Sequence, residues 1–342
     1  MTNKPPQRTV ATDLAPISPA DSGRPRVSVV VRSMGRLSSL IELVERILAQ
    51  EHDSFEIVVI EQTLAPDPSA WLRLEEVAGD ARLRVLKHAP LGGPAARNVG
   101  VRAARGDLIV LIDDDDLPIE SDWITSHESA YADPGLVGIT GRQVRNVGES
   151  YPYSRFMRPF IRKRCMRYSF LKTAYTYAGF DEDVDGIEWL HGTNSSFRRG
   201  LVERAGLWDT TVETQDEHSF AFRLHEALLP GEYLAFRTTP VIVRRLDVPG
   251  GMDKRRARLE SELASHLAFV FRIIGTYYPV RFRLGFPLYL MWVVGRTIAW
   301  VWDRDRPGAT PTRRLVDSLK VPVLLPGAVL KEHGADYRAF RK

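Results

Sequence analysis

An alternation of apolar strands with amphipathic helices over residues 26–112 constrains the fold of this chain more than any other feature. Four short apolar runs, rich in β-branched residues, have the composition of strands buried on both faces. They are VSVVV (27–31), FEIVVI (55–60), LRVLK (83–87) and DLIVLI (107–112). Residues 35–50 have the apolar spacing of a helix, and residues 94–106 are expected to form a helix that ends at a glycine. The sequence therefore predicts an α/β fold: a Rossmann-like, mostly parallel sheet flanked by helices.

The overall composition is that of an ordinary globular protein. Of 342 residues, 44% are hydrophobic and 26% charged, which excludes fibrous and wholly disordered chains. Residues 1–25 contain five prolines and no apolar run, so we expect a disordered leader that is not a secretory signal. The single cysteine, Cys165, excludes an internal disulfide and favours a reducing, cytosolic setting.

Four consecutive aspartates, Asp113–Asp116, follow the most hydrophobic of the predicted strands. In sheets of this kind, ligands bind beyond the carboxyl ends of the strands. Adjacent carboxylates repel one another unless a cation or hydrogen-bond donors compensate them, and Mg²⁺ or Mn²⁺ is the natural cation for oxygen ligands. The alternative is an acidic turn that is solvated at the sheet edge. The position at the end of this strand favours the cation site.

The sequence lacks the motifs of several other enzyme classes. There is no GxxxxGK[ST] loop, and Gly92-Gly93 does not continue into GxGxxG. HExxH, CxxC and GxSxG are also absent, which argues against zinc hydrolases and against serine hydrolases with a nucleophile elbow. Nucleotide phosphates would therefore have to be held through a metal rather than by a glycine-rich loop.

Five segments, in the right order over residues 26–246, make the chain resemble the family 2 glycosyltransferases, which have the A-type nucleotide-sugar transferase fold. The segments are VSVVVRSMGR (27–36), EIVVIEQT (56–63), AARNVGVRAARGDLIVLIDDDD (95–116), HGTNSSFRRGLVERAGLWD (191–209) and TQDEHSFAFRLHE (214–226). The resemblance implies a nucleotide-diphospho-sugar donor and a divalent cation, Mg²⁺ or Mn²⁺.

The resemblance also implies roles for the aspartates and for the second strand. Asp113 would contact the donor ribose or the metal, and Asp115 would ligate the metal. Asp114 is assigned to the donor, and Asp114 or Asp116 would replace the metal ligands if the register were shifted by one residue. Glu61 lies where the family usually has an aspartate that binds the nucleobase, so the identity of the base stays open.

Three further residues are expected on the donor side. Arg32 and Ser33 lie in the turn after the first strand, and Arg32 stands where the family commonly has a proline. Arg97 could reach the donor diphosphate because it is near the start of a helix beside the acidic turn. The alternative for Arg97 is an ordinary arginine on a helix surface.

The pair Asp216-Glu217 supplies the candidate base. An inverting transfer needs a base that removes a proton from the acceptor hydroxyl. By comparison with the family the base falls on Glu217, with Asp216 as its acidic neighbour and as the alternative base. Both acids precede an amphipathic helical segment, so they could instead only stabilise the helix N-terminus. His218 could orient Glu217 or lie on the helix surface.

The acceptor side is expected to be formed by Trp189, His191, Gly192, Thr193 and Asn194. The Trp189 ring could stack on a sugar, although a buried packing role is the alternative. Arg244 and Arg245 stand where the family often has a histidine that completes the metal site. Arginine cannot ligate a cation but binds phosphate, so either the metal has fewer protein ligands or an arginine partly replaces it.

The C-terminal part of the chain is basic and aromatic. The last 67 residues carry 12 Lys and Arg against 5 Asp and Glu, whereas the other 275 residues carry 35 against 38. Residues 284–302 have only Arg296 charged, but the uncharged part is shorter than the roughly 20 residues that span a bilayer. The basic and aromatic residues of 267–283 suit an anionic membrane surface, and the run at 153–168 could line a membrane-facing acceptor side. An interfacial or re-entrant anchor, a helical hairpin packed on the catalytic domain and a spanning helix are the alternatives.

These expectations combine into one functional hypothesis with an alternative. The hypothesis is an inverting glycosyltransferase that acts on a lipid-linked or glycan acceptor, peripheral at the cytoplasmic face of the membrane, with a catalytic domain over 26–255 and a helical, membrane-associating region over 256–342. The alternative is a non-catalytic module of the same fold that binds sugar nucleotides or glycans. Nucleic acid is not an expected partner, because no RNA- or DNA-binding motif accompanies the basic residues. Processive polysaccharide synthases of the family that this chain resembles usually carry a QxxRW motif, and its absence here implies single or few sugar additions.

Overall fold

The computed structural model describes residues 25–144, 165–173, 181–212, 215–245, 258–302 and 310–334. Their contacts divide them into two compact units. Described residues within 25–169 and 173–245 form the sheet unit, and residues 170–172 with 258–334 form the helical unit. The leader up to residue 24, most of the basic run at 153–168 and the expected boundary at 255–256 lie outside the described residues.

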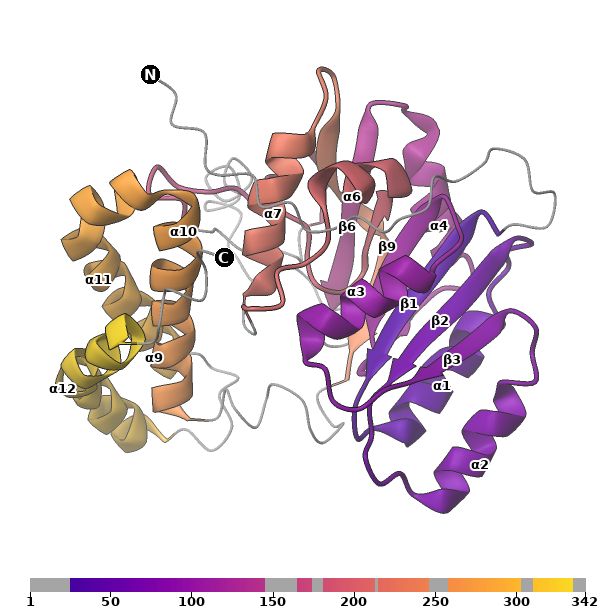
Figure 1. The fold of residues 1–342 in the computed structure, drawn as a ribbon, viewed down its shortest axis with the longest axis horizontal. Coiled ribbons are helices and arrows are strands. Elements are labelled where there is room, and N and C mark those ends of the chain that lie inside the picture. The colour runs from indigo at the N-terminus through magenta and orange to yellow at the C-terminus, as the bar shows by residue number, and fades with distance from the viewer. Residues whose placement is uncertain are drawn as a thin grey trace. The chain divides into compact units, whose positions relative to one another are not determined.

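Strands and helices alternate through the first half of the sheet unit (Figure 1). They are β1 (Val27–Ser33), α1 (Leu37–Leu48), β2 (Phe55–Glu61), α2 (Pro68–Val77), β3 (Leu83–Lys87), α3 (Gly93–Ala103) and β4 (Leu108–Asp113). β1 pairs in parallel with β2 and β4, and β2 pairs in parallel with β3, as the alternation predicts. α3 ends before the expected glycine, Gly106. That glycine lies against β1, where a Cβ atom would come within 2.6 Å of the Ser28 nitrogen.

The second half of the sheet unit is more irregular. It contains β5 (Asp116–Pro118), α4 (Trp123–Ser129), η1 (Ala130–Ala132), β6 (Leu136–Val144), β7 (Val184–Asp185), β8 (Ser195–Arg198), α6 (Arg199–Ala205), α7 (Asp216–Ala227) and β9 (Tyr233–Arg244). The strand order is β3-β2-β1-β4-β8-β6-β9-β5, with β7 paired to β9. β8 runs antiparallel to β4 and β6, and β5 and β7 run antiparallel to β9, while β6 and β9 are parallel.

The α/β class is therefore as predicted, but the sheet is mixed over the described strands. Its parallel part from β3 to β4 is the part in which strands and helices alternate in the sequence. β8 is reached through the loop at 191–194 rather than through a crossover helix, and this allows it to enter the sheet antiparallel.

Each face of the sheet carries its own apolar core, because successive strand residues point to opposite faces. On one face Val27, Val29 and Val31 of β1 pack with residues of α1, α2 and α4. On the other face Val30 of β1 packs with residues of α3, α6 and α7. Burial on both faces explains why the central strands are continuous apolar runs.

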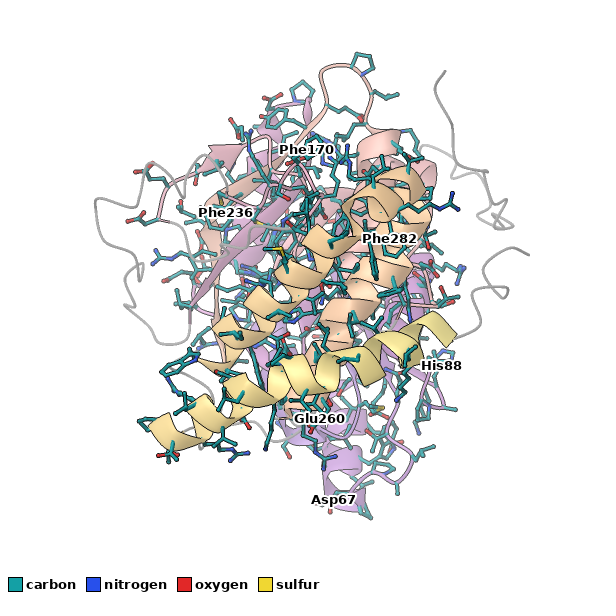
Figure 2. All side chains as sticks on the ribbon, turned by 90° about the vertical axis from the view of Figure 1, so that its left-hand side faces the viewer. Asp67, His88, Phe170, Phe236, Glu260 and Phe282 are labelled. Carbon is teal, nitrogen blue, oxygen red and sulfur yellow. The ribbon has the colours of Figure 1, made fainter. Side chains whose placement is uncertain are left out.

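The helical unit follows in the sequence. It contains α9 (Leu259–Ala268), the π-helical turn η2 (Phe269–Ile274), α10 (Gly275–Tyr277), α11 (Pro279–Val301) and α12 (Pro311–Gly334). Leu259, Val301 and Val321 join α9, α11 and α12, and Figure 2 shows α12 crossing the other two helices. α11 is long and apolar enough to cross a bilayer by length and composition alone, a test that a core helix of a soluble protein also passes.

Candidate functional site

The carboxyl ends of β2, β1 and β4 lie side by side because these parallel strands pair in matched register. Ser33 is opposite Glu61 in the pair of β1 with β2, and Arg32 is opposite Asp113 in the pair of β1 with β4. Four of the residues expected on the donor side are therefore neighbours at one edge of the sheet. This is the edge at which sheets of this kind bind ligands.

Two arginines, one near the end of β1 and one in the turn after it, neutralise part of the aspartate run. Arg32 donates from Nε to Oδ1 of Asp113 at 2.9 Å and from Nη2 to Oδ2 at 3.3 Å. Arg36, just before α1, pairs with Asp114 and donates from Nη1 to Oδ2 of Asp115 at 2.8 Å. A guanidinium group that contacts a carboxylate through two nitrogens makes a strong, directional ion pair.

Thr193 lies in the loop of residues 189–194, the acceptor loop, and connects this loop to the aspartate run by hydrogen bonds. Its hydroxyl accepts from the backbone N–H of Asp113 at 3.0 Å and donates to Oδ2 of Asp116 at 2.7 Å. The next residue, Asn194, is fully buried and has a positive φ of 49°. Its side-chain amide donates to the backbone carbonyls of Arg142 and Pro240. Asn194 therefore fixes the shape of the loop, while Thr193 faces the carboxylates.

Three of the aspartates could hold a metal ion. Asp113, Asp115 and Asp116 each offer a carboxylate oxygen, and these oxygens lie within 4.8 Å of one another. One oxygen of Asp115 and one of Asp116 are buried without a hydrogen-bond partner. Asp116 takes part directly, although the sequence interpretation kept it only as an alternative to its neighbours.

Burial and the arginines set the ionisation of the aspartates in opposite directions. Burial alone would raise the pKa of Asp113, but the adjacent Arg32 outweighs it, so the pKa lies below its ordinary value. Burial raises the pKa of Asp114 to about 7 and that of Asp116 to about 8. The cluster thus contains carboxylates whose charged form the protein alone does not fully stabilise.

Arg97 and Asp216 form a buried ion pair between α3 and α7. The other terminal nitrogen of Arg97 donates to the carbonyl of Gly192 at 3.3 Å. A Cβ atom on Gly192 would come within 2.6 Å of Arg97, so the glycine permits this approach. Arg97 is therefore not on a helix surface, and it connects the acid of α7 with the acceptor loop.

Glu217 lies in the first turn of α7, next to this ion pair. Burial would raise the pKa of Glu217, but the neighbouring His218 and His191 outweigh it and lower that pKa. Burial raises the pKa of Asp216, although Arg97 opposes the shift. The two acids of the pair thus differ: Glu217 favours its charged form, whereas Asp216 relies on Arg97.

Aromatic rings surround this part of the acceptor side. Trp189 is 2% exposed, and its ring centroid lies 4.9 Å from that of His218 and 5.7 Å from that of His191. The Nδ1 atom of His218 is 3.0 Å from the hydroxyl oxygen of Tyr168. The burial of Trp189 fits the packing alternative, in which the indole supports the rings that border Glu217.

The remaining predicted residues lie at the margins of the cluster. The carboxylate of Glu61 accepts from the backbone N–H of Thr63 at 2.9 Å, which turns it toward the loop after β2. Arg244 is opposite Asp116 in the pair of β5 with β9 and lies 3.7 Å from Asp115. The side chain of Arg245 instead pairs with Glu42. Of the two arginines, Arg244 is the one that faces the aspartates.

The sequence interpretation did not single out Arg36, although it contacts two of the four aspartates. A signal was available, because Arg36 is a cation in the turn after β1 and the carboxyl ends of parallel strands, where the aspartate run was expected, lie at one edge of a sheet. Its exact partners depend on side-chain placement, which the sequence pattern does not contain.

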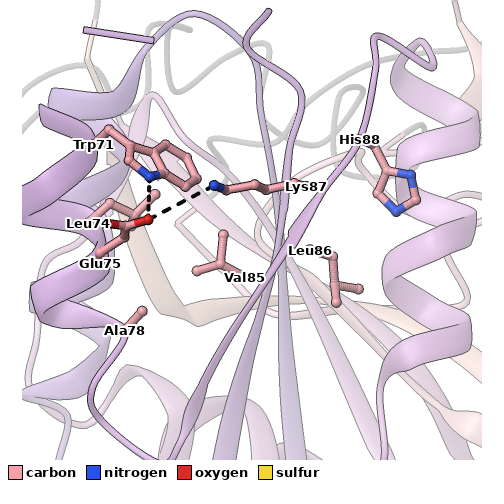
Figure 3. A pocket seen from close by; sticks show the side chains of 8 residues that line it. All are labelled: Trp71, Leu74, Glu75, Ala78, Val85, Leu86, Lys87 and His88. Carbon is pink, nitrogen blue, oxygen red and sulfur yellow. Dashed lines mark hydrogen bonds and ion pairs between the residues drawn. The ribbon is translucent and has the colours of Figure 1, made fainter. Parts of the chain in front are cut away.

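A hollow of about 430 Å³ lies apart from these residues, between α2 and β3 (Figure 3). The Nζ atom of Lys87 is 3.6 Å from the centroid of the Trp71 ring, and the indole N–H of Trp71 donates to Glu75. Figure 3 shows that Trp71, Glu75 and Lys87 are engaged with one another. None of the predicted site residues lines this hollow.

Comparison with known proteins agrees with the fold and the motifs. The sequence profile of Glycosyl transferase family 2 matches residues 28–206, just over half of the chain. The chain is 24% identical over 208 residues to an uncharacterized glycosyltransferase, YwdF, of Bacillus subtilis, which covers 58% of this chain and 67% of the relative. It is 29% identical over 208 residues to glucosyl-dolichyl phosphate glucuronosyltransferase of Haloferax volcanii, which covers 59% of this chain and 61% of the relative.

A solved structure supports the same fold. Mannosyltransferase PcManGT from Pyrobaculum calidifontis, solved in complex with GDP-Man and Mn²⁺, superposes with a TM-score of 0.52 at 20% sequence identity. The superposition covers 91% of this chain and 87% of the mannosyltransferase. This chain belongs to glycosyl transferase family 2 and has the A-type glycosyltransferase fold.

Proposed function

We propose that this protein is an inverting glycosyltransferase that transfers a hexosyl group from a nucleotide-diphospho-sugar to a lipid-linked or glycan acceptor. The observation that carries the proposal is the combination of a carboxylate trio at the end of β4, in which Asp115 and Asp116 are buried, with Glu217 in the first turn of α7. Thr193 donates a hydrogen bond to Asp116 of the trio, and the Arg97–Asp216 pair adjoins Glu217. An acid cluster for the donor and a base for the acceptor are the two parts that such a reaction needs.

The carboxylate trio fits a divalent cation. One oxygen from each carboxylate lies close to the others, and one oxygen of Asp115 and one of Asp116 are buried without a hydrogen-bond partner. Carboxylates are ligands that Mg²⁺ and Mn²⁺ prefer, with Asp113 and Asp115 as the first candidates here and Asp116 as the third. A cation bound there would offset the negative charge that grows on the leaving diphosphate. On the donor side we assign Ser33, Glu61 and the two arginines Arg32 and Arg97.

Glu217 is assigned as the base. It takes the proton of the acceptor hydroxyl while that oxygen attacks the anomeric carbon from the face opposite the diphosphate. The bond between the anomeric carbon and the diphosphate breaks, and its electron pair leaves with the nucleoside diphosphate. The lowered pKa of Glu217 keeps its carboxylate charged at neutral pH, as a base requires. Asp216 is engaged with Arg97 and positions the start of α7.

The names of similar proteins support the donor and acceptor classes. PcManGT was solved with GDP-Man and Mn²⁺, a sugar nucleotide and a divalent cation. The Haloferax relative is named for transfer to a glucosyl-dolichyl phosphate, which is a lipid-linked acceptor. We assign the acceptor of this protein to the loop of residues 189–194, where Gly192 and Thr193 border the cluster.

The helical unit supports a peripheral contact with an anionic membrane. α11 buries Gly285, Tyr289, Val293, Thr297 and Val301 at a spacing of four residues. Its exposed side is mostly apolar, with Leu284 at 83% and Met291 at 69% exposure. Arg283 and Arg296 are exposed on the same helix. An apolar stripe with basic residues matches a helix that lies in the headgroup region, and we place this contact at the cytoplasmic face.

A thermal-shift screen tests the proposed function. The purified protein is heated with UDP-, GDP- and dTDP-sugars, each with Mn²⁺ and each with EDTA. We expect one nucleotide class to raise the melting temperature in the presence of Mn²⁺, because a ligand that binds only the folded state stabilises it. If no sugar nucleotide stabilises the protein under either condition, the proposal is wrong.

A further inference from the structure

Arg32 pairs with Asp113, which is one of the carboxylates that the proposed metal ion would need. Its guanidinium contacts both oxygens of Asp113, at 2.9 Å and 3.3 Å. Asp113 is a member of the trio whose oxygens converge within 4.8 Å. An arginine and a metal ion are both cations, so they compete for the same carboxylate.

The guanidinium group of Arg32 also packs against the start of α3, at Gly93. A Cβ atom added to Gly93, the first residue of α3, would come within 2.2 Å of Nη1 of Arg32. The neighbouring atom is the end of a flexible side chain, so an alanine there would displace Arg32 rather than the backbone. A side chain at position 93 would therefore push the guanidinium group of Arg32 away from the place that it occupies beside Asp113.

Arg32 differs from the other arginines at the cluster. Arg36 divides its contacts between Asp114 and Asp115, and its side chain is 13% exposed. Arg244 approaches Asp115 only to 3.7 Å. Arg32 pairs with a single carboxylate, and its side chain is 28% exposed. It can therefore leave Asp113 for a new partner with less rearrangement than Arg36.

We propose that Arg32 is an exchangeable counter-ion, which holds Asp113 until a divalent cation takes its place and then binds the donor diphosphate. This inference rests on the proposed function. The donor diphosphate is an anion that the guanidinium group of Arg32 could bind after leaving Asp113. Binding of the donor would therefore draw Arg32 away from Asp113, for which it competes with the metal. Binding of the metal to Asp113 would in turn free Arg32 to bind the donor. Metal and nucleotide then bind with positive coupling, which is reciprocal by thermodynamic linkage.

Binding of Mn²⁺, followed by electron paramagnetic resonance of the free ion, tests this exchange without any assay of activity. The variant Arg32→Met removes the guanidinium group that competes with the metal. The variant Gly93→Ala keeps this group but fills the space beside α3 that it occupies. We expect both variants to bind Mn²⁺ about tenfold more tightly than wild type when no nucleotide is present, a typical coupling size. We also expect UDP or GDP to enhance Mn²⁺ binding about tenfold less in the variants than in wild type.

Two control variants separate exchange from general electrostatics. Arg237→Met removes a cation that pairs with Asp185 instead, and Gly200→Ala adds a methyl group where the nearest atom is 3.6 Å away. Both should bind Mn²⁺ like wild type. If wild type binds Mn²⁺ but Arg32→Met and Gly93→Ala bind it no more tightly, the exchange is refuted and the metal-dependent function stands. If wild type binds neither Mn²⁺ nor any nucleotide, the proposed function fails with it.

Discussion

The side chain of His127 lies within hydrogen-bond distance of Asn194 in the acceptor loop and of Ser196 just after it. It is fully buried in α4, its Nδ1 lies 2.9 Å from the hydroxyl of Ser196, and its Nε2 lies 3.2 Å from Oδ1 of Asn194. The same oxygen of Asn194 accepts from the indole N–H of Trp123 at 2.9 Å. This network holds the loop in which Thr193 faces the aspartates. Protonation of His127 would place an unpaired charge inside it.

His127 should therefore make the protein less stable in mild acid than it would be without a titrating group at this position. Burial lowers the pKa of His127 to about 3, whereas an unfolded histidine titrates near 6.5. Between these values the unfolded state binds the extra proton, so the contribution of His127 to the free energy of unfolding decreases as the pH falls below about 6.5. At pH 5 the loss from His127 is about 2 kcal/mol relative to pH 7.5. Urea denaturation of wild type and of His127→Gln at both pH values measures this loss as the difference between the two proteins, because the raised pKa values of Asp114 and Asp116 act in the opposite direction in both.

The variant His127→Gln is the control for this prediction. Glutamine can bond to Ser196 and Asn194 but does not titrate, so the variant should lose about 2 kcal/mol less than wild type between pH 7.5 and pH 5. The same pH dependence in both proteins would contradict the prediction that His127 stays neutral in the folded state at pH 5.

At the scale of elements, α7 shows what the sequence could and could not predict. The acids at its start follow from the segment DEHSFAFRLHE, in which a helix is recognisable by its apolar spacing. The partner of Asp216 is Arg97, which is 119 residues away in the sequence. Such a pair depends on how α3 and α7 pack on the sheet, and local patterns carry no information about it. The contacts of Arg36 with Asp114 and Asp115 could not be predicted for the same reason.

The exposed stripe of α11 gives a prediction about membrane binding. The double variant Leu284→Glu with Leu288→Glu puts two charges on the apolar side of the helix without touching its buried residues. If this side lies in the headgroup region, flotation with anionic liposomes should weaken by about tenfold or more, since each buried leucine contributes about 1.5 kcal/mol or more.

The matched control changes two exposed leucines of the sheet unit, Leu72→Glu with Leu229→Glu, which are 66% and 52% exposed. These substitutions add the same charge to the protein and should leave flotation unchanged. Equal flotation of both double variants and wild type would remove α11 as the membrane contact.

At the scale of the whole molecule, the fold was predictable where sequence periodicity and topology agree. From β1 to β4, the four strands and the helices α1 and α3 are those expected from the sequence, whereas α2 was not predicted. Parallel pairing then brings Arg32, Ser33, Glu61 and Asp113 to one edge. Beyond Asp116 the chain folds through short strands and loops, so the antiparallel entry of β8 has no periodic signal. The acceptor loop was found by resemblance, and its contacts only by structure.

The rate of sugar transfer by Glu217→Gln, measured with the donor found in the thermal-shift screen, tests the central claim most directly. Glutamine keeps the size of the side chain but cannot accept the proton. We predict that transfer falls about 10²- to 10⁴-fold, the usual contribution of a general base, while the donor dissociation constant stays within about twofold of wild type. Transfer at the wild-type rate in this variant would contradict the assignment of Glu217. A wild-type protein that binds the donor but transfers no sugar to any acceptor would support a binding module instead.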